Sequence, residues 1–190
     1  MADINLQTNS SEVESIKTLI LEHGKKVKVR KKDFFIRTGE ICDEIAYIKR
    51  GCFKNTCVTS KKKERILSFA FEDEFIGCYT PTQNNSEAIY SIQAIEDSTI
   101  IKISQKEFSS FFQVKVNNQI YVRKFVDVLA FEFLNKIISL QCDTPEERYL
   151  QLQKRIPDLF ERISIKDIAL HIGTTPETLS RIRARFLKML

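Results

Sequence analysis

The C-terminal run from Ile163 to Lys188 constrains the fold more than any other part of the chain. It holds two amphipathic helical patterns, and Gly173 separates them. The first pattern follows Ser164, a good N-cap residue, and its apolar side chains recur at spacings of three and four, so they share one helix face. Gly173 stands where a helix must reverse through a positive φ. The shared apolar face consists of Ile165, Ile168, Ala169 and Ile172.

The second pattern begins directly after the glycine. Thr175 is its predicted N-cap and Pro176 occupies the first helical position. Two short helices joined by a tight turn that contains glycine are typical of a helix-turn-helix. The small side chain of Ala169 lets two crossing helices approach closely. The inward-facing side chains of the second helix are predicted to be Leu179, Ile182 and Phe186.

The opposite face of this second helix is polar and basic. In a recognition helix the N-terminal residues meet base edges in the major groove, where Arg reads guanine and Glu accepts from cytosine. We therefore expect Arg181 and Glu177 to contact bases, with Arg183, Arg185 and Lys188 facing phosphates. An amphipathic helix that closes a small domain and binds nothing is the alternative. The predicted DNA-contacting residues are Thr175, Glu177, Thr178, Ser180, Arg181, Arg183, Arg185 and Lys188.

Charge and composition agree with a partner that is a polyanion. The chain has a net charge of +5, and residues 144–190 hold nine Lys or Arg against six Asp or Glu. This asymmetry favours double-stranded DNA as a partner of the C-terminal end. No segment approaches the ~20 apolar residues of a membrane span, and the polar, acidic N-terminus does not resemble a signal peptide. We expect a cytoplasmic protein with no membrane partner.

Cysteine and histidine usage gives no sign of a metal site. None of the five cysteines forms a Cys-x-x-Cys pair, and the two histidines, His23 and His171, are far apart in sequence. This spacing matches neither zinc nor iron–sulfur patterns. The sequence predicts no cofactor and mostly buried, reduced thiols at Cys42, Cys52, Cys57, Cys78 and Cys142.

Between residues 25 and 104 the chain is rich in β-branched and aromatic runs separated by turn residues. Short strands at this spacing without intervening helices predict an antiparallel sandwich or barrel, preceded by a short helix over residues 11–22. The fold class is therefore α+β. The side chains that we assign to the core are Leu67, Phe69 and Phe71 on one strand, and Ile45 and Tyr47 on another.

A helical period returns over residues 105–113, and a long helix without Gly or Pro is predicted over 117–142. Its apolar residues alternate by three and four, as in a coiled-coil seam. We expect this helix to form a homodimer; a helix buried within one subunit is the alternative. A further helix is capped at Thr144 and ends before Pro157. The predicted seam is Val122, Val126, Leu129, Phe133, Lys136 and Leu140.

Two groups of short motifs complete the sequence: Arg37-Thr38-Gly39-Glu40, Asp43-Glu44, Tyr47-Ile48 and Gly51 in the β-rich region, then Ile168-Ala169, Gly173 and Glu177-Thr178-Leu179-Ser180-Arg181. In these motifs and in the order of its elements the chain resembles the cyclic-AMP receptor/FNR (Crp-Fnr) family of bacterial transcription regulators. The resemblance implies three parts: a cyclic-nucleotide-binding-like β-roll, or jelly roll, over residues 1–116, a dimerisation helix over 117–142 and a DNA-binding domain over 143–190. It implies a regulator, not an enzyme, with RNA polymerase as a further candidate partner. From Glu146 onward the chain looks like a subgroup frequent in Bacteroidetes.

The chain departs from the family in two places. The family usually continues into a β-hairpin wing, and only a few residues follow the recognition helix here, so we expect weaker phosphate contacts. In the cyclic-nucleotide cassette, Cys78 replaces a glutamate, and Ala88-Ile89 replaces the family's Arg followed by Ser or Thr. We therefore expect an effector other than cyclic AMP. The pocket, predicted to be filled by side chains or to hold an uncharged ligand, would involve Phe69, Gly77, Cys78, Tyr79, Ala88, Ile89 and Tyr90.

Several other functions remain open at this point. The chain could be a cyclic-nucleotide-responsive regulator, a haem or redox sensor of the same family, or an adaptor protein with a decayed DNA-binding domain. A cupin-type enzyme would need a cluster of His and carboxylate ligands in the barrel, and only His23 lies anywhere near it.

Overall fold

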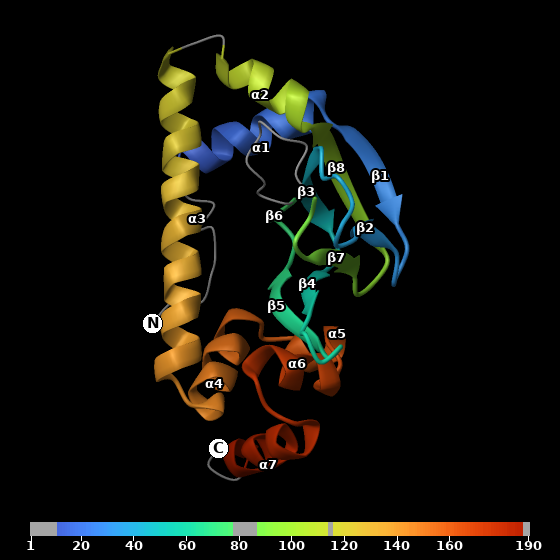
Figure 1. The fold of residues 1–190 in the computed structure, drawn as a ribbon, viewed down its shortest axis with the longest axis vertical. Helices are drawn as coiled ribbons and strands as arrows, with labels where there is room; N and C mark the ends of the chain where they lie inside the picture. Colours follow the sequence, from blue (N-terminus) through green and yellow to red (C-terminus); the bar gives the residue numbers. More distant parts are fainter. Residues whose placement is uncertain (1–10, 78–86, 114–115, 188–190) are drawn as a thin grey trace.

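The computed structural model describes residues 11–77, 87–113 and 116–187 (Figure 1). The expected order of a β-rich region, a long helix and a group of short helices is confirmed. The elements are α1 (Ser11–His23), β1 (Lys25–Val29), β2 (Phe34–Ile36), β3 (Glu44–Arg50), β4 (Phe53–Val58), β5 (Glu64–Ala70), β6 (Phe75–Gly77), β7 (Ser91–Ala94), β8 (Ser98–Ser104), α2 (Gln105–Gln113), α3 (Val116–Cys142), α4 (Pro145–Arg155), α5 (Leu159–Arg162), α6 (Ile165–Ile172) and α7 (Pro176–Leu187).

The strands form two antiparallel sheets, in the orders β1-β8-β3-β6 and β2-β7-β4-β5. Successive side chains of a strand point to opposite faces, so each sheet contributes alternate residues to the space between them. The interior of this sandwich is apolar and closely packed. Its buried residues are Ile36, Cys42, Ala46, Ile48, Phe53, Ala70, Ile76, Ala88, Ile92, Ala94 and Ile100.

The outer face of the first sheet is covered by helices. Tyr47 of β3 and Ile101 of β8 are buried against Ile16 and Ile20 of α1, and Phe108 of α2 packs on the same cluster. Ile45 and Tyr47 therefore belong to the core, but they face these helices and not the sandwich interior.

Strand β5 carries a further apolar surface that faces the C-terminal helices. Phe69 and Phe71 are buried there as expected, whereas Leu67 is 39% exposed. The reason is a register shift in the β4–β5 pairing, where Asn55 opposes Ser68 but Thr56 opposes Ile66. Leu67 is thus the extra residue of a β-bulge, and the bulge turns its side chain away from the face that Phe69 and Phe71 share. The cluster comprises Cys52, Ile66, Phe69, Phe71, Tyr149, Leu152, Ile156, Leu159, Ile163, Ile168, Ala169, Ile172, Leu179 and Ile182.

The long helix α3 runs beside the sandwich and connects α2 to the C-terminal helices (Figure 1). The side chains of Val122, Val126 and Leu129 lie outside the described residues. Lys136, which the sequence placed in an intermolecular seam, instead reaches His171 of the same chain, with Nζ 3.2 Å from Nε2. No described helix is long and apolar enough to cross a membrane. Among the side chains of α3 that the structure describes, the exposed apolar ones are Phe131, Phe133, Leu134, Ile137 and Leu140.

Candidate nucleic-acid interface

Helix α6 is defined by caps at both ends. Ser164 has an extended backbone and accepts a hydrogen bond from the amide of Asp167, at 3.1 Å. Gly173 is left-handed, with φ 75°, and the Thr174 amide donates to the Ala169 carbonyl at 2.9 Å. These contacts satisfy polar groups that a helix end leaves unpaired. Ile165, predicted to be inward-facing, lies at the edge of the apolar face and is exposed.

Helix α7 follows after a three-residue connection, residues 173–175. Thr175 is the N-cap, as predicted: its hydroxyl accepts a hydrogen bond from the amide of Thr178 at 3.3 Å, and Pro176 begins the helix. Leu179 and Ile182 are fully buried against α6, where the methyl group of Ala169 is also inaccessible to solvent. The close approach of α6 and α7 that a helix-turn-helix requires is therefore present.

The face of α7 that points away from α6 is polar and accessible. α7 forms one end of the molecule, remote from the sandwich (Figure 1). The pKa of Glu177 lies below its usual range because Thr175 and the backbone donate to the carboxylate, with a smaller contribution from nearby Arg181. The helix thus presents a carboxylate and a guanidinium side by side near its N-terminus. The exposed residues are Thr175, Glu177, Thr178, Ser180, Arg181, Arg183 and Arg185.

Two of these arginines already have partners within the chain. The guanidinium of Arg183 lies over the ring of Phe160, 4.1 Å from its centroid. Arg185 donates to Glu146 of α4 at 2.9 Å. A phosphate contact, which the sequence predicts for both, would therefore replace a contact within the chain. Lys188 lies outside the described residues.

Arg148 of α4 contacts both the end of α3 and the end of α6, a role that the sequence did not indicate. Its Nε donates to the carbonyl of Ile172 at 2.8 Å, and its Nη1 donates to Ser139 at 3.2 Å and to Asp143. The C-terminal ends of α6 and α3 are thereby joined through one guanidinium.

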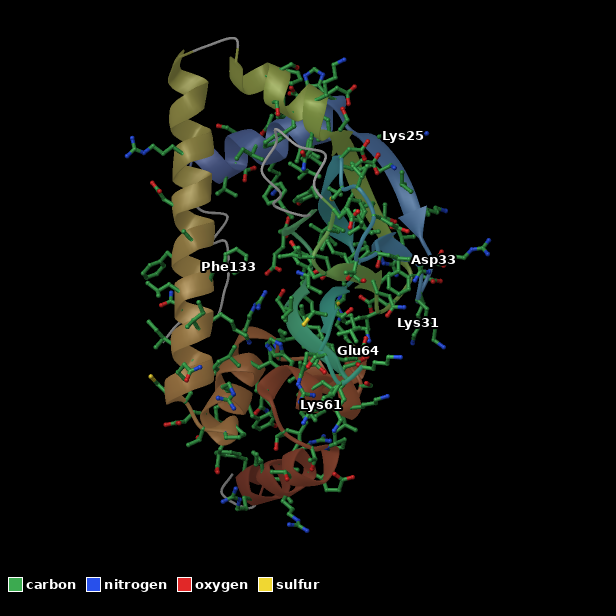
Figure 2. All side chains as sticks on the ribbon, in the orientation of Figure 1. Lys25, Lys31, Asp33, Lys61, Glu64 and Phe133 are labelled. Carbon is green, nitrogen blue, oxygen red and sulfur yellow. The ribbon has the colours of Figure 1, made fainter. Side chains whose placement is uncertain are left out.

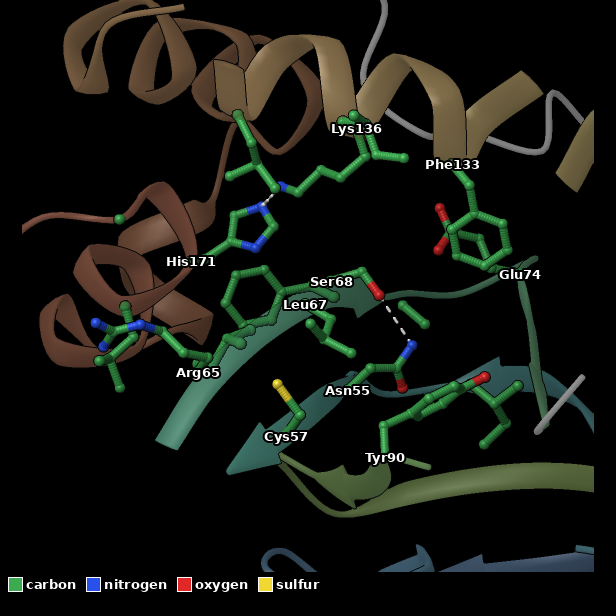
Figure 3. Close-up of a pocket in the computed structure, with 18 of the residues that line it drawn as sticks. Asn55, Cys57, Arg65, Leu67, Ser68, Glu74, Tyr90, Phe133, Lys136 and His171 are labelled. Carbon is green, nitrogen blue, oxygen red and sulfur yellow. Dashed lines mark hydrogen bonds between the residues drawn. The ribbon is translucent and has the colours of Figure 1, made fainter. Parts of the chain in front are cut away.

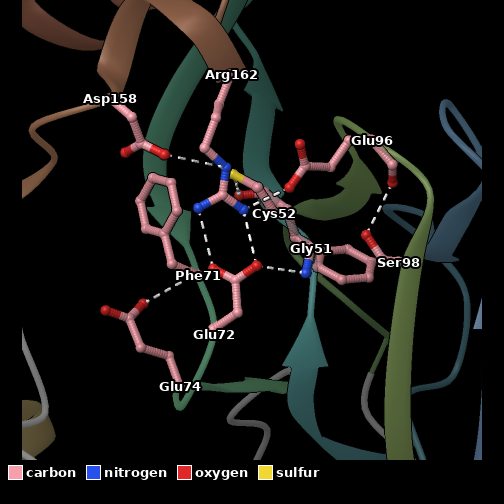
Figure 4. A network of polar contacts seen from close by, with 10 residues as sticks. Gly51, Cys52, Phe71, Glu72, Glu74, Glu96, Ser98, Asp158 and Arg162 are labelled. Carbon is pink, nitrogen blue, oxygen red and sulfur yellow. Dashed lines mark hydrogen bonds and ion pairs between the residues drawn. The ribbon is translucent and has the colours of Figure 1, made fainter.

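Ion pairs connect helices α4 and α5 to the sandwich (Figure 4). Arg162 pairs with Glu72 and Glu96, and Arg155 pairs with Glu74 at 2.7 Å. Burial raises the pKa of Glu74, and Arg155 opposes this effect. These contacts surround the apolar cluster on β5 and fix the orientation of α4 to α6 relative to the sheet.

A cavity of about 590 Å³ opens between β4, β5, α3 and α6 (Figure 3). Of the predicted pocket residues, Phe69, Gly77 and Tyr90 line it, and the Tyr90 hydroxyl donates to the Gly77 carbonyl at 2.9 Å. Ala88 lies in the sandwich interior and Ile89 is 78% exposed, so neither contributes to the lining. Cys78 and Tyr79 lie outside the described residues.

The cysteine side chains, which could serve as metal ligands, are dispersed. Cys42 and Cys52 are buried, Cys57 is half-buried and Cys142 is exposed, all as free thiols. Burial raises the pKa of the Cys52 thiol strongly. Within the described parts of the chain, no three His, Cys, Asp or Glu side chains are grouped so that they could hold a metal ion.

Comparison with known proteins gives a consistent result. Residues 26–115 match the family described as the cyclic nucleotide-binding domain. No curated protein matches the chain.

Solved structures match over nearly the whole length. FixK2 from Bradyrhizobium japonicum is 18% identical with a TM-score of 0.73, covering 87% of this chain and 85% of that one. The c-di-GMP responsive global regulator CLP from Xanthomonas campestris is 13% identical with a TM-score of 0.63, covering 92% of both chains. The catabolite activator protein of Thermus thermophilus is 15% identical with a TM-score of 0.57, covering 96% and 86%. These likenesses establish a shared fold.

Proposed function

We propose that this chain, whose residues 26–115 match the cyclic nucleotide-binding domain family and whose overall fold is that of the Crp/Fnr regulators, is a homodimeric transcription regulator of the cytoplasm and not an enzyme. The protein reads double-stranded DNA with α7. In this proposal residues 1–116 receive a signal, 117–142 form the dimer and 143–190 bind DNA.

The observation that carries the proposal is the construction of α7. Its inner face is anchored by Leu179 and Ile182, while Glu177 and Arg181 remain accessible near its N-terminus. That is the part of a recognition helix that meets base edges. Arg181 can donate two hydrogen bonds to guanine, and Glu177 can accept from cytosine.

The exposed apolar surface of α3 supports a dimer. Phe133, Ile137 and Leu140 line the cavity mouth, and Figure 2 shows Phe133 projecting from α3 on the side of the sandwich. Leu134 is 52% exposed and does not line the cavity, and Phe131 is likewise exposed. The surface available to a second copy of α3 therefore extends around the helix from the predicted seam toward Leu134 and Phe131. Covering it would stabilise the dimer at ~25 cal/mol per Å² of apolar surface.

The effector, in our proposal, is not cyclic AMP. A cyclic phosphate in a partly buried site needs a fixed cation and amide donors. At the family's arginine position stands Ala88, which is 2% exposed, and Glu87 beside it carries a negative charge.

Selection of bound fragments from a random DNA pool tests the proposal. A dimer with two recognition helices should enrich a pseudo-palindrome whose half-sites lie about one helical turn apart. Arg181→Ala should cost roughly 1–3 kcal/mol on the enriched site and relax its specificity. Equal losses on enriched and random DNA would contradict the assignment of Arg181, and a pool without any enriched sequence would contradict specific DNA binding.

A further inference from the structure

The turn between β4 and β5 carries three consecutive lysines, Lys61, Lys62 and Lys63, and all three are exposed. Thr59 closes the turn: its amide donates to the Lys63 carbonyl at 2.9 Å, and the Lys62 amide donates to the Thr59 carbonyl at 2.8 Å. Within the parts of the chain that the structure describes, none of the three lysines has a carboxylate within ion-pair distance. Three cations are therefore grouped on a hydrogen-bonded turn.

The backbone of Lys62 is left-handed, with φ 56°. This position of a hairpin turn favours glycine, because a Cβ atom there lies too close to the backbone. Lysine is therefore a poor choice for the conformation of the turn. Its positive charge, not its backbone preference, accounts for its presence.

The β4–β5 hairpin is attached to the first helix of the helix-turn-helix. Ile66 of β5 is buried in the same cluster as Ile168 and Ile172 of α6. Nζ of Lys54, on β4, lies 3.3 Å from Oδ1 of Asp167 in the first turn of α6. The lysine turn is thereby held beside α6 and α5 (Figure 1).

The charge of this surface is positive. Lys54 also lies 3.6 Å from a carboxylate oxygen of Glu64, so one cation is shared by Glu64 and Asp167. Lys166, which precedes Asp167 on α6, is exposed like the lysines of the turn. A closely spaced set of lysines with so few acidic neighbours attracts a polyanion.

The turn lies on the outer side of the C-terminal helices. In Figure 2, Lys61 is found on the side of these helices that is remote from α3. The dimer proposed above forms through α3, so the turns of both subunits face outward. DNA that extends beyond the two half-sites passes this outer side.

We propose that the lysine turn, residues 61–63, binds the phosphate backbone of DNA that flanks the sequence read by α7. This inference rests on the regulator function proposed above. A phosphate contact carries no sequence information directly, so the turn raises the affinity for DNA without changing the preferred sequence.

Two duplexes that differ only in length test the contact. The short one ends where the selected half-sites end, and the long one continues for about one helical turn on each side. In fluorescence anisotropy titrations the unaltered chain should bind the long duplex roughly ten-fold more tightly. The dependence of log affinity on log salt should be steeper by ~1.8 for the long duplex, about 0.9 for one phosphate on each subunit.

A variant with Lys61→Gln, Lys62→Gly and Lys63→Gln removes the three charges and retains the turn, because glycine adopts the positive φ readily. It should bind both duplexes as tightly as the unaltered chain binds the short one. Circular dichroism during heating should show a melting temperature no lower than that of the unaltered chain.

The matched control removes three charges from the other end of the sandwich. Lys25→Gln, Lys26→Gln and Lys28→Gln change exposed positions of β1, and Figure 2 shows Lys25 far from Lys61. This variant should keep the full preference for the long duplex.

Equal affinity of the unaltered chain for the two duplexes, an undiminished preference in the turn variant, or an equal loss in the β1 variant would overturn the proposal. The first comparison needs no variant, so it stands even if the turn variant does not fold. Binding of the short duplex tests the regulator function separately, because that duplex lacks the flanks. A chain that bound neither duplex would overturn both proposals.

Discussion

The guanidinium of Arg162 donates two hydrogen bonds to the carboxylate of Glu72, at 3.0 and 2.9 Å. Arg162 is the last residue of α5 and Glu72 follows β5, so this bidentate pair joins α5 to the sandwich. Glu96 accepts from the same guanidinium, and the Gly51 amide donates to Glu72 at 2.6 Å (Figure 4). One arginine therefore orients two carboxylates beside the apolar cluster.

Replacing Arg162 by Ala should destabilise the protein by about 2 kcal/mol, because Glu72 and Glu96 would be left close together without their cation. The estimate is discounted for the partial exposure of both carboxylates to water. Urea unfolding followed by circular dichroism measures it. Lys166→Ala, at an exposed position on α6, should stay within ~0.5 kcal/mol. A loss no larger than that of this control would show that the pair contributes nothing.

The same pair predicts acid sensitivity. Burial alone would raise the pKa of Glu72, but Arg162 and the Gly51 amide outweigh it and hold the pKa below the usual range. A carboxyl group whose pKa is lower in the folded chain than in the unfolded chain stabilises the fold at pH values above its unfolded pKa of ~4.3. This stabilisation is lost as the pH falls through the pKa of the folded state. Unfolding free energies between pH 7 and pH 3 should fall less steeply for Glu72→Gln. Buried Glu74, with a raised pKa, acts in the opposite direction, so the difference between parent and variant is the quantity to compare.

Local signals in the sequence predicted the described helices other than α5. The predicted helix over 105–113 coincides with α2, and Thr144 forms a capping box with Glu147 at the start of α4. Gly173 takes the left-handed conformation that its position required. Caps and turns depend on residues within one helical turn, so the chain itself specifies them.

Contacts between distant elements were not accessible in this way. Ile66 joins Phe69 in the cluster that packs against α6 because a bulge at Leu67 changes the alternation of the strand, and no spacing rule predicts a bulge. Lys136 reaches His171, thirty-five residues away in sequence. Short helix α5 and the clamp made by Arg148 likewise exist only through tertiary packing.

Dimerisation should depend on the exposed apolar surface of α3. Leu134→Glu places two like charges in the interface of a dimer and should yield monomers at micromolar concentration in sedimentation experiments. Leu134→Met keeps the apolar volume and should remain dimeric. Leu134 does not line the cavity, so the change leaves that site intact. Sedimentation that shows a monomeric parent protein would contradict a dimer altogether.

Arg185 offers a prediction that the sequence alone did not contain. Its pair with Glu146 competes with any phosphate contact, so Glu146→Gln should release the guanidinium toward DNA. Each additional neutralised phosphate steepens the dependence of log affinity on log salt by about 0.9. Titrations of an enriched site at several salt concentrations should show this change for Glu146→Gln and not for Glu161→Gln, at an exposed position of α5. An unchanged slope would mean that Arg185 does not reach the backbone.

Cyclic nucleotides should bind poorly, although residues 26–115 match the cyclic nucleotide-binding domain family. Where the family places an arginine, the structure has Ala88 turned into the sandwich interior, and exposed Glu87 would repel a phosphate. Losing one charge-assisted pair costs roughly 2–5 kcal/mol, which weakens the binding of a micromolar ligand by about 30-fold to several-thousand-fold. Calorimetry with cyclic AMP and cyclic GMP should therefore give no dissociation constant at or below ~10 μM, about −7 kcal/mol. A tighter value for either nucleotide would mean that another cation or the backbone amides hold the phosphate, and that the loss of the arginine does not exclude the family's ligand.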